Sequence, residues 1–224
     1  MVHAAPLLVH VRALRGLWPG TVGLGRAGHV ALTFDDGPDP AGTPGFLDLL
    51  ERRSVRATFF LLGVMAERSP DLVRRLRDEG HEVAVHSWDH RSHLLRGLRG
   101  TQDQLARTAE LLERLTGTRP TLQRPPYGHL TAGGVRAARE VGLTPVLWTS
   151  WGRDWEAAAD PVSVARTVSR GRVDGGTVLL HDSDCTSSPG SWRATLGALP
   201  VLLDTWEEAG LRVGPLREHA AART

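Results

Sequence analysis

Short apolar runs rich in β-branched residues alternate with helical segments from residue 29 onward, and this alternation constrains the fold more than any other feature of the 224-residue chain. The runs are HVALTF (29–34), RATFFLL (56–62), HEVAVH (81–86), TLQR (121–124), LTPVLWT (143–149), TVLLH (177–181) and LRVG (211–214). Strands that alternate with helices along a chain form parallel sheets covered by helices. The sequence therefore predicts an α/β fold of seven strand–helix units, either a barrel or an open sheet.

The segments between the runs carry helix caps. Ser69 precedes Pro70 as a candidate N-cap, Asp160 stands in the same way before a proline, and a long segment is expected to begin at Thr101 and to end at Gly117. No change in composition divides residues 29–224, which are expected to form one domain. Residues 1–28 fit no unit and are expected to be an N-terminal extension packed over one end.

Composition excludes some classes of protein. The formal net charge is +2 and no basic cluster occurs, so a nucleic-acid partner is not expected. The single cysteine, Cys185, cannot form an internal disulfide and is expected to be a small buried filler. The oligomeric state stays open.

Targeting signals are weak. The stretch APLLVHV (5–11) is short and interrupted by His10, so no export signal or membrane span is expected. The default expectation is a cytoplasmic protein, and an extracellular or cell-envelope location if a further segment precedes this one.

Reactive side chains follow the ends of the predicted strands. In parallel α/β folds the carboxyl ends of the strands share one rim, where ligands bind. We therefore expect residues spread over about 150 positions to meet there. They are Asp35 and Asp36 after the first run, His86 at the end of the third, Arg124 at the end of the fourth, Asp154 and Trp155 after the fifth, and His181 at the end of the sixth. Asp182 and Asp184 are expected to be solvated.

The segment HSWDH places His86 and His90 four positions apart, a spacing that brings two imidazoles to one point on a helical turn. Two histidines and one carboxylate leave a coordination position open, as in catalytic zinc sites. Because side chains alternate along a strand, Asp35 and Asp36 are expected to point in different directions, one as a metal ligand and the other toward the attacking water.

The order of these motifs resembles the polysaccharide deacetylases of carbohydrate esterase family 4, over residues 29 to about 214. TFDDGP resembles that family's first motif, which implies Asp35 as catalytic base and Asp36 as metal ligand; HSWDH resembles the second, with His86 and His90 as ligands. RPPYG resembles the third, which implies that Arg124 orients the base and that the Tyr127 N–H binds the oxyanion. LLH resembles the last, with His181 as general acid and Leu179 beside the acetyl methyl group.

The fourth motif matches only in part. The family often has Asp-x-x-Asp-Trp, whereas residues 151–155 are WGRDW. The second acid and the tryptophan remain as Asp154, the expected partner of His181, and Trp155, and Trp151 replaces the first acid. Substrate choice at the rim is therefore open. The resemblance also implies a distorted (β/α)7 barrel of parallel strands.

The implied function is metal-dependent removal of acetyl groups from a glycan. Zn²⁺ is the expected metal, with Co²⁺, Ni²⁺ or Mn²⁺ as alternatives, and the expected partner is an acetylated glycan or oligosaccharide. Whether the bond is an amide or an ester stays open.

Competing interpretations include a non-catalytic glycan-binding protein and an amidase of a small non-glycan substrate. Fe(II) oxygenases also use two His and one carboxylate, but the capped helices argue against their all-β scaffold. An aspartyl-phosphate phosphatase needs Asp-x-Asp, and Gly37 occupies the second Asp position.

Overall fold

The computed structural model of the protein describes residues 20–219. Within them, eight parallel strands form one sheet in the order β5-β4-β3-β2-β1-β7-β6, and β8 also pairs with β1. The strands are β1 (His29–Asp35), β2 (Thr58–Leu62), β3 (Glu82–Ser87), β4 (Leu122–Gln123), β5 (Thr144–Pro145), β6 (Ser150–Trp151), β7 (Gly176–His181) and β8 (Arg212–Gly214). The predicted distorted barrel of parallel strands is confirmed.

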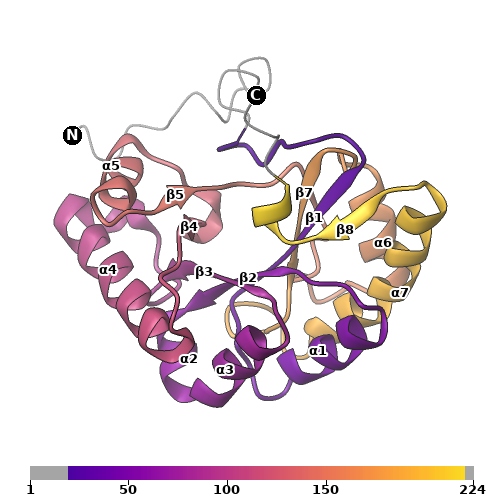
Figure 1. Ribbon diagram of the computed structural model, residues 1–224, viewed down its shortest axis with the longest axis horizontal. Coiled ribbons are helices and arrows are strands. Elements are labelled where there is room, and N and C mark those ends of the chain that lie inside the picture. Colours follow the sequence, from indigo (N-terminus) through magenta and orange to yellow (C-terminus); the bar gives the residue numbers. More distant parts are fainter. Residues whose placement is uncertain (1–19, 220–224) are drawn as a thin grey trace.

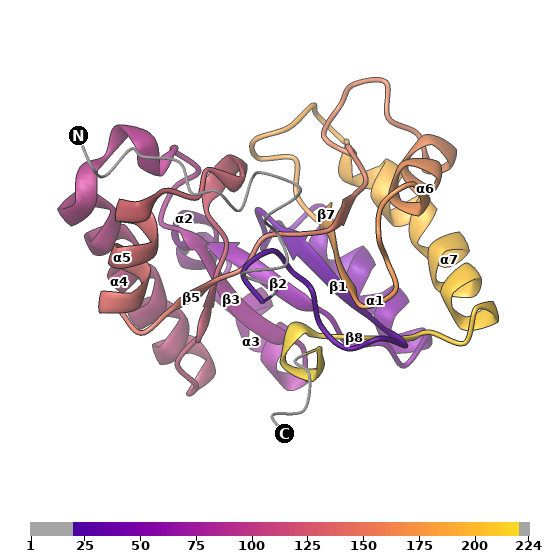
Figure 2. The same cartoon turned by 90° about the horizontal axis from the view of Figure 1, so that it is seen from above.

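Helices cover the outside of this sheet (Figure 1). They are α1 (Thr43–Arg52), α2 (Gly63–Arg68), α3 (Pro70–Asp78), α4 (Gly97–Thr116), α5 (Ala132–Glu140), α6 (Pro161–Ser169) and α7 (Trp192–Glu208). Helices α4 and α5 flank one side of the sheet and α6 and α7 the other, as the view from above also shows (Figure 2). Their apolar faces meet the buried side chains of the strands in one large core.

Strand β1 lies in the middle of the sheet and is buried along its whole length. It pairs with β7 from Val30 to Asp35, and that register sets Asp35 opposite His181. On its other side, Thr33–Asp35 pairs with β2 and His29–Ala31 pairs with β8. Two of the predicted reactive residues are therefore neighbours because of strand register.

The fifth predicted strand, 143–149, is wrong as a single element. Only β5 lies within this run, and β6 begins just after it; the two strands are the opposite ends of the strand path. Between them, the carbonyl oxygens of Val146 and Leu147 accept hydrogen bonds from the buried guanidinium of Arg124, at 3.3 and 3.2 Å. A buried cation needs such acceptors, so these two carbonyls bind Arg124 rather than a neighbouring strand.

The observed helix starts agree only in part with the N-caps predicted from the sequence. The side chains of Thr131 and Asp160 accept backbone hydrogen bonds at the starts of α5 and α6. Ser69 precedes α3 without a side-chain cap bond. Helix α4 begins at Gly97, four residues before Thr101, whose hydroxyl donates to the Gly97 carbonyl inside the helix instead of capping it.

Residues 20–28 run along the barrel beside the gap between β5 and β6. Thr21 accepts a backbone hydrogen bond from Leu147, and Thr177 donates its hydroxyl to Gly23. Val22 is buried with Leu147 and Leu130. The domain boundary at residue 28 stays a prediction, and the stretch 5–11 lies outside the described residues.

Among residues 20–219, none of the helices combines the length and the hydropathy that crossing a bilayer requires.

Candidate active site

The doublet Asp35-Asp36 spans the end of β1, and both side chains are buried. Asp36 follows the strand with a left-handed backbone, φ 78°. Both carboxylates reach His86 from different sides: Asp35 Oδ2 lies 3.8 Å from Nδ1 and Asp36 Oδ1 lies 3.3 Å from Nε2. The two carboxylates therefore point in different directions, as expected, but the cause is the left-handed backbone of Asp36 and not the alternation of side chains along a strand.

Asp36, His86 and His90 form a candidate metal site, with ligand atoms that all lie within 4.8 Å of one another. Asp36 Oδ1 is 3.4 Å from His90 Nε2, and this oxygen is buried with no hydrogen-bond partner in residues 20–219. His86 Nδ1 lies 2.9 Å from the Arg124 carbonyl, which can only accept, so Nδ1 carries the proton and Nε2 presents a lone pair. A carboxylate oxygen that faces the lone pair of His86 Nε2 calls for a cation between them, and Asp36, His86 and His90 fit a divalent metal.

The charges of the site suit such a cation. Burial raises the pKa of Asp36, but the imidazoles of His86, His181 and His90 lower it by more, so that it lies well below its usual range. Burial lowers the pKa of His90 to about 4, against the opposite effect of Asp36. At neutral pH, Asp36 is therefore ionised and His90 is neutral, which are the forms that bind metals.

Arg124 is fully buried and holds Asp35 in place. Its Nη1 donates to Asp35 Oδ1 at 2.7 Å and to the Thr33 hydroxyl at 2.8 Å. The guanidinium carbon also lies 4.1 Å from the centre of the Phe60 ring. Burial lowers the pKa of Arg124, and Asp35 opposes that shift. The ion pair fixes one oxygen of Asp35 and leaves the other toward His86.

His181 and Asp154 form a second buried pair. His181 Nδ1 is 2.9 Å from Asp154 Oδ1, and the His181 backbone N–H donates to Oδ2 at 2.7 Å. The Thr195 hydroxyl from α7 donates to the same oxygen at 2.6 Å. Burial lowers the pKa of His181, but Asp154 and, more weakly, Asp36 and Asp35 raise it to about 10. His181 therefore carries a proton at neutral pH.

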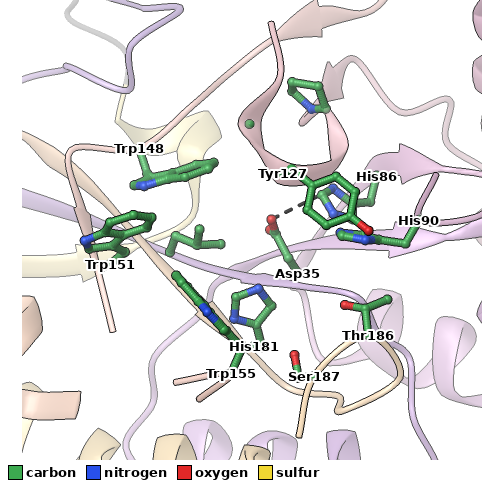
Figure 3. A pocket seen from close by; sticks show the side chains of 13 residues that line it. Asp35, His86, His90, Tyr127, Trp148, Trp151, Trp155, His181, Thr186 and Ser187 are labelled. Atoms are coloured by element: carbon green, nitrogen blue, oxygen red, sulfur yellow. Dashed lines mark ion pairs between the residues drawn. The ribbon is translucent and has the colours of Figure 1, made fainter. Parts of the chain in front are cut away.

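These groups surround a cavity of about 270 Å³ (Figure 3). Trp148, Trp151 and Trp155 lie on one side, and Tyr127 and His90 lie on the other. The cavity is lined by Asp35, His86, His90, Pro125, Tyr127, Gly128, Trp148, Trp151, Trp155, Leu179, His181, Thr186 and Ser187.

The indole wall is continuous. The ring centres of Trp148 and Trp151 are 6.0 Å apart, those of Trp151 and Trp155 are 5.3 Å apart, and Trp155 meets His181 edge-on at 5.6 Å. Trp151 pairs with Leu179 in the β6–β7 register and is 41% exposed. The apolar wall thus includes Trp151, the residue of the fourth motif at which the sequence left the choice of substrate open.

Tyr127 lies opposite this wall, 60% exposed, with a left-handed backbone of φ 60°. Its ring packs edge-on against His90, with centres 4.4 Å apart. Within residues 20–219, its backbone N–H donates to no acceptor. That donor is available to a ligand.

Sequence reasoning missed several contributors and misplaced two residues. Thr186 and Thr195 donate to the carboxylates of Asp36 and Asp154, and Thr33 accepts from Arg124, but a threonine in a loop, a helix or a strand carries no local signal of such a contact. Asp182 is fully buried and bonded to Thr43 rather than solvated, whereas Cys185 is exposed rather than a buried filler. For Asp182, the only signal in the sequence was its position directly after His181 at the rim.

The comparisons with known proteins agree with this geometry. The polysaccharide deacetylase family model matches residues 24–146, more than half of the chain. Peptidoglycan-N-acetylglucosamine deacetylase PgdA of Listeria monocytogenes is 40% identical over 159 residues, which are 71% of this chain and 33% of that protein. The chain thus spans about a third of that relative's length.

Two further relatives are covered more fully. A chitooligosaccharide deacetylase of Azorhizobium caulinodans is 30% identical over 84% of this chain and 92% of that protein. The crystal structure of the Bc1960 peptidoglycan N-acetylglucosamine deacetylase superposes with a TM-score of 0.84 at 30% identity, covering 93% of this chain and 96% of that one. The chain belongs to the polysaccharide deacetylase family.

Proposed function

We propose that the protein is a metal-dependent hydrolase that removes acetyl groups from a glycan. The observation that carries this proposal is Oδ1 of Asp36, which has no hydrogen-bond partner among the described residues and faces the Nε2 atoms of His86 and His90 at 3.3 and 3.4 Å. An anchored carboxylate, Asp35, and a protonated imidazole, His181, line the cavity beside it. A cation site between a base and an acid supports hydrolysis of an acyl bond.

Asp36, His86 and His90 would hold the metal. A bound divalent ion supplies Lewis acidity and lowers the pKa of water, toward roughly 7 in favourable zinc sites. The two imidazoles and the carboxylate favour zinc, and Co²⁺, Ni²⁺ or Mn²⁺ remain as alternatives.

Each residue of the site then has one role in the reaction. Asp35, held by Arg124, takes a proton from the attacking water while the water oxygen forms a bond to the acetyl carbonyl carbon. The Tyr127 N–H donates to the oxyanion that develops, a type of contact whose loss costs about 2.7–4 kcal/mol. His181 donates its proton to the departing nitrogen as the C–N bond breaks, which leaves acetate and a free amine.

Asp154 orients the imidazole ring of His181. It accepts from Nδ1, so the acidic proton on Nε2 faces away from Asp154. Because an amine is a poor leaving group, this proton is needed for amide cleavage, and less so for an acetyl ester.

The substrate we propose is an N-acetylated sugar of an oligosaccharide or polymer, with O-acetyl groups as a second possibility. The relatives are named for action on peptidoglycan and on chitooligosaccharides. Leu179 supplies an apolar surface for the acetyl methyl group, and Trp155 with its neighbours offers flat faces for sugar rings. We assign this activity to a catalytic domain of residues 29–224.

Acetate release tests the proposal. N-acetylglucosamine oligomers and acetylated xylan are incubated with metal-stripped protein and with zinc restored, beside Asp36→Ala and His181→Ala. We expect zinc-dependent release that both changes abolish. No release with zinc bound, from either polymer, would contradict the glycan assignment. Release from small acetyl amides alone would favour the amidase, and glycan binding without release would favour a binding protein.

A further inference from the structure

We infer that Thr186 is a positioning residue that makes Asp36 bind the metal through one oxygen. This inference rests on the metal site of the proposed function. The Thr186 hydroxyl donates to Asp36 Oδ2 at 2.5 Å, across 150 positions of sequence. The other oxygen, Oδ1, has no hydrogen-bond partner in residues 20–219 and faces the two histidines. The two oxygens of Asp36 are thus divided between a hydroxyl and the cation position.

The division matters because a carboxylate can turn about its χ2 bond. Asp36 is fully buried, so without a donor either oxygen, or both, could face His86 and His90. A hydroxyl that donates to an ionised carboxylate makes a strong, short bond. Thr186 has a β-branched side chain with few χ1 rotamers, which adds stiffness to the contact. Outer partners of this kind typically change metal affinity about 10- to 100-fold when removed.

The loop that carries Thr186 is itself anchored to the turn that carries Asp36. Just before Thr186, the Ser183 hydroxyl donates to Asp39 Oδ2 at 3.1 Å. Just after it, the Ser188 N–H donates to the Trp155 carbonyl at 3.2 Å. The hydroxyl is therefore in place before a metal arrives, which is what preorganisation requires.

The start of the same loop is anchored more deeply. The buried Asp182 accepts from the Thr43 hydroxyl at 2.5 Å, at the first residue of α1. Thr43 also accepts a hydrogen bond from the Asp39 N–H at 2.7 Å. The turn after β1 and the loop after β7 thus share one hydrogen-bonded network. The Cys185 thiol of this loop donates to the Asp36 backbone carbonyl at 3.5 Å, and Thr186 donates to the Asp36 carboxylate.

Ser187 provides a matched control. Its side chain also lines the cavity, one position further along the loop, but its hydroxyl makes no hydrogen bond to any of residues 20–219. Removing it leaves Asp36 untouched.

The experiment is a zinc titration in competition with a chromophoric chelator, on the metal-stripped wild-type protein, Thr186→Val, Thr186→Ser and Ser187→Ala. Valine keeps the shape of threonine and removes the donor, whereas serine keeps the donor. We expect Thr186→Val to bind zinc about 10- to 100-fold more weakly, Thr186→Ser to stay within about threefold of wild type, and Ser187→Ala to be unchanged. The thermal midpoints of the four metal-free proteins should agree, which separates positioning from folding.

Wild-type zinc affinity in Thr186→Val would overturn the inference while leaving the proposed function intact. So would a Thr186→Ser protein as weak as the valine variant, because that result would assign the effect to packing. A wild-type protein that binds no zinc in this titration would contradict both the inference and the metal site itself.

Discussion

At the scale of single residues, the proton on His181 depends mainly on Asp154. Burial lowers the pKa of His181, and the Asp154 carboxylate at 2.9 Å is the largest of the charges that raise it to about 10. A divalent ion at the site would offset the weaker contributions of Asp36 and Asp35, but not that of Asp154. The acid form of His181 is thus maintained at neutral pH by one carboxylate.

Asp154→Asn should therefore move the alkaline limb of activity. The amide keeps an oxygen that can accept from Thr195 or from the His181 N–H, and it removes the charge. With the protonated imidazole no longer stabilised, the alkaline limb of kcat/KM should fall to lower pH by at least about one unit. The measurement is kcat/KM for an N-acetylglucosamine trimer from pH 6 to 10 with saturating zinc. An alkaline limb that stays at the wild-type pH would show that another group sets it.

Trp151 is a second single residue whose replacement should have a measurable effect, in this case on substrate affinity. It is half exposed on the cavity wall, in contact with Trp148 and Trp155, where the family often has an acid. An aromatic contact contributes about 0.5–1.5 kcal/mol, so Trp151→Ala should raise KM for an N-acetylglucosamine trimer roughly two- to twelvefold. Trp151→Phe should retain most of the affinity. Steady-state kinetics on the trimer and on the monosaccharide check this, and an equal loss on both would mean that Trp151 shapes the acetyl pocket instead.

At the scale of elements, the turn between β1 and α1 packs closely against the loop after β7. A Cβ at Gly42 would overlap the backbone oxygen of Asp182, which cannot move aside as a flexible side chain can. Gly42 has φ −98°, so alanine suits its backbone and only the space is lacking. This contact holds the two segments that carry Asp36 and Thr186 together.

Gly42→Ala should lower the free energy of unfolding by about 1–3 kcal/mol, as overpacking does elsewhere. Gly100→Ala is the matched control: it lies inside α4, where the nearest atom to a new Cβ, the Arg96 Cβ, is 3.6 Å away. That change should be neutral or stabilise by up to about 1 kcal/mol. The free energies of unfolding of the two metal-free variants are measured with urea. If Gly42→Ala is as stable as Gly100→Ala, the loop after β7 can shift to make room for the new Cβ, which would contradict the prediction.

At the scale of the whole molecule, buried neutral histidines link stability to pH. Burial lowers the pKa of His29 and of His81 to about 4, helped by His219 at the first and by Arg217 at the second. The unfolded chain, with histidine pKa values near 6.5, binds more protons than the folded one between these limits. Their contribution to stability is thus complete above about pH 6.5 and is lost as the pH falls toward 4.

His81→Asn tests this linkage. The Asn amide oxygen can replace His81 Nδ1, which accepts the Ala57 N–H at 3.2 Å, and it does not titrate. We expect the variant to lose less stability between pH 6.5 and 4, by up to about 1.4 kcal/mol per pH unit. The free energy of unfolding is measured by urea for both metal-free proteins across that range. Parallel pH profiles would contradict the assignment.

Local pattern predicted much of the fold and part of the candidate site. Periodicity and caps indicated the order of strands and helices, because both depend on residues a few positions apart, as at Asp160 and α6. The parallel arrangement then placed Asp35, His86 and His181 on one rim, as the strand registers show.

Tertiary contacts decided the rest. Only Thr144–Pro145 of the predicted strand 143–149 forms a strand, because the carbonyls of Val146 and Leu147 accept hydrogen bonds from Arg124, more than twenty positions away. Thr186 meets Asp36 across 150 positions, a distance over which no spacing or propensity carries information. The sequence alone determined the alternation of elements and the types of residue at the rim. Only the folded barrel determined which oxygen, nitrogen or hydroxyl meets which, because those contacts depend on register and packing.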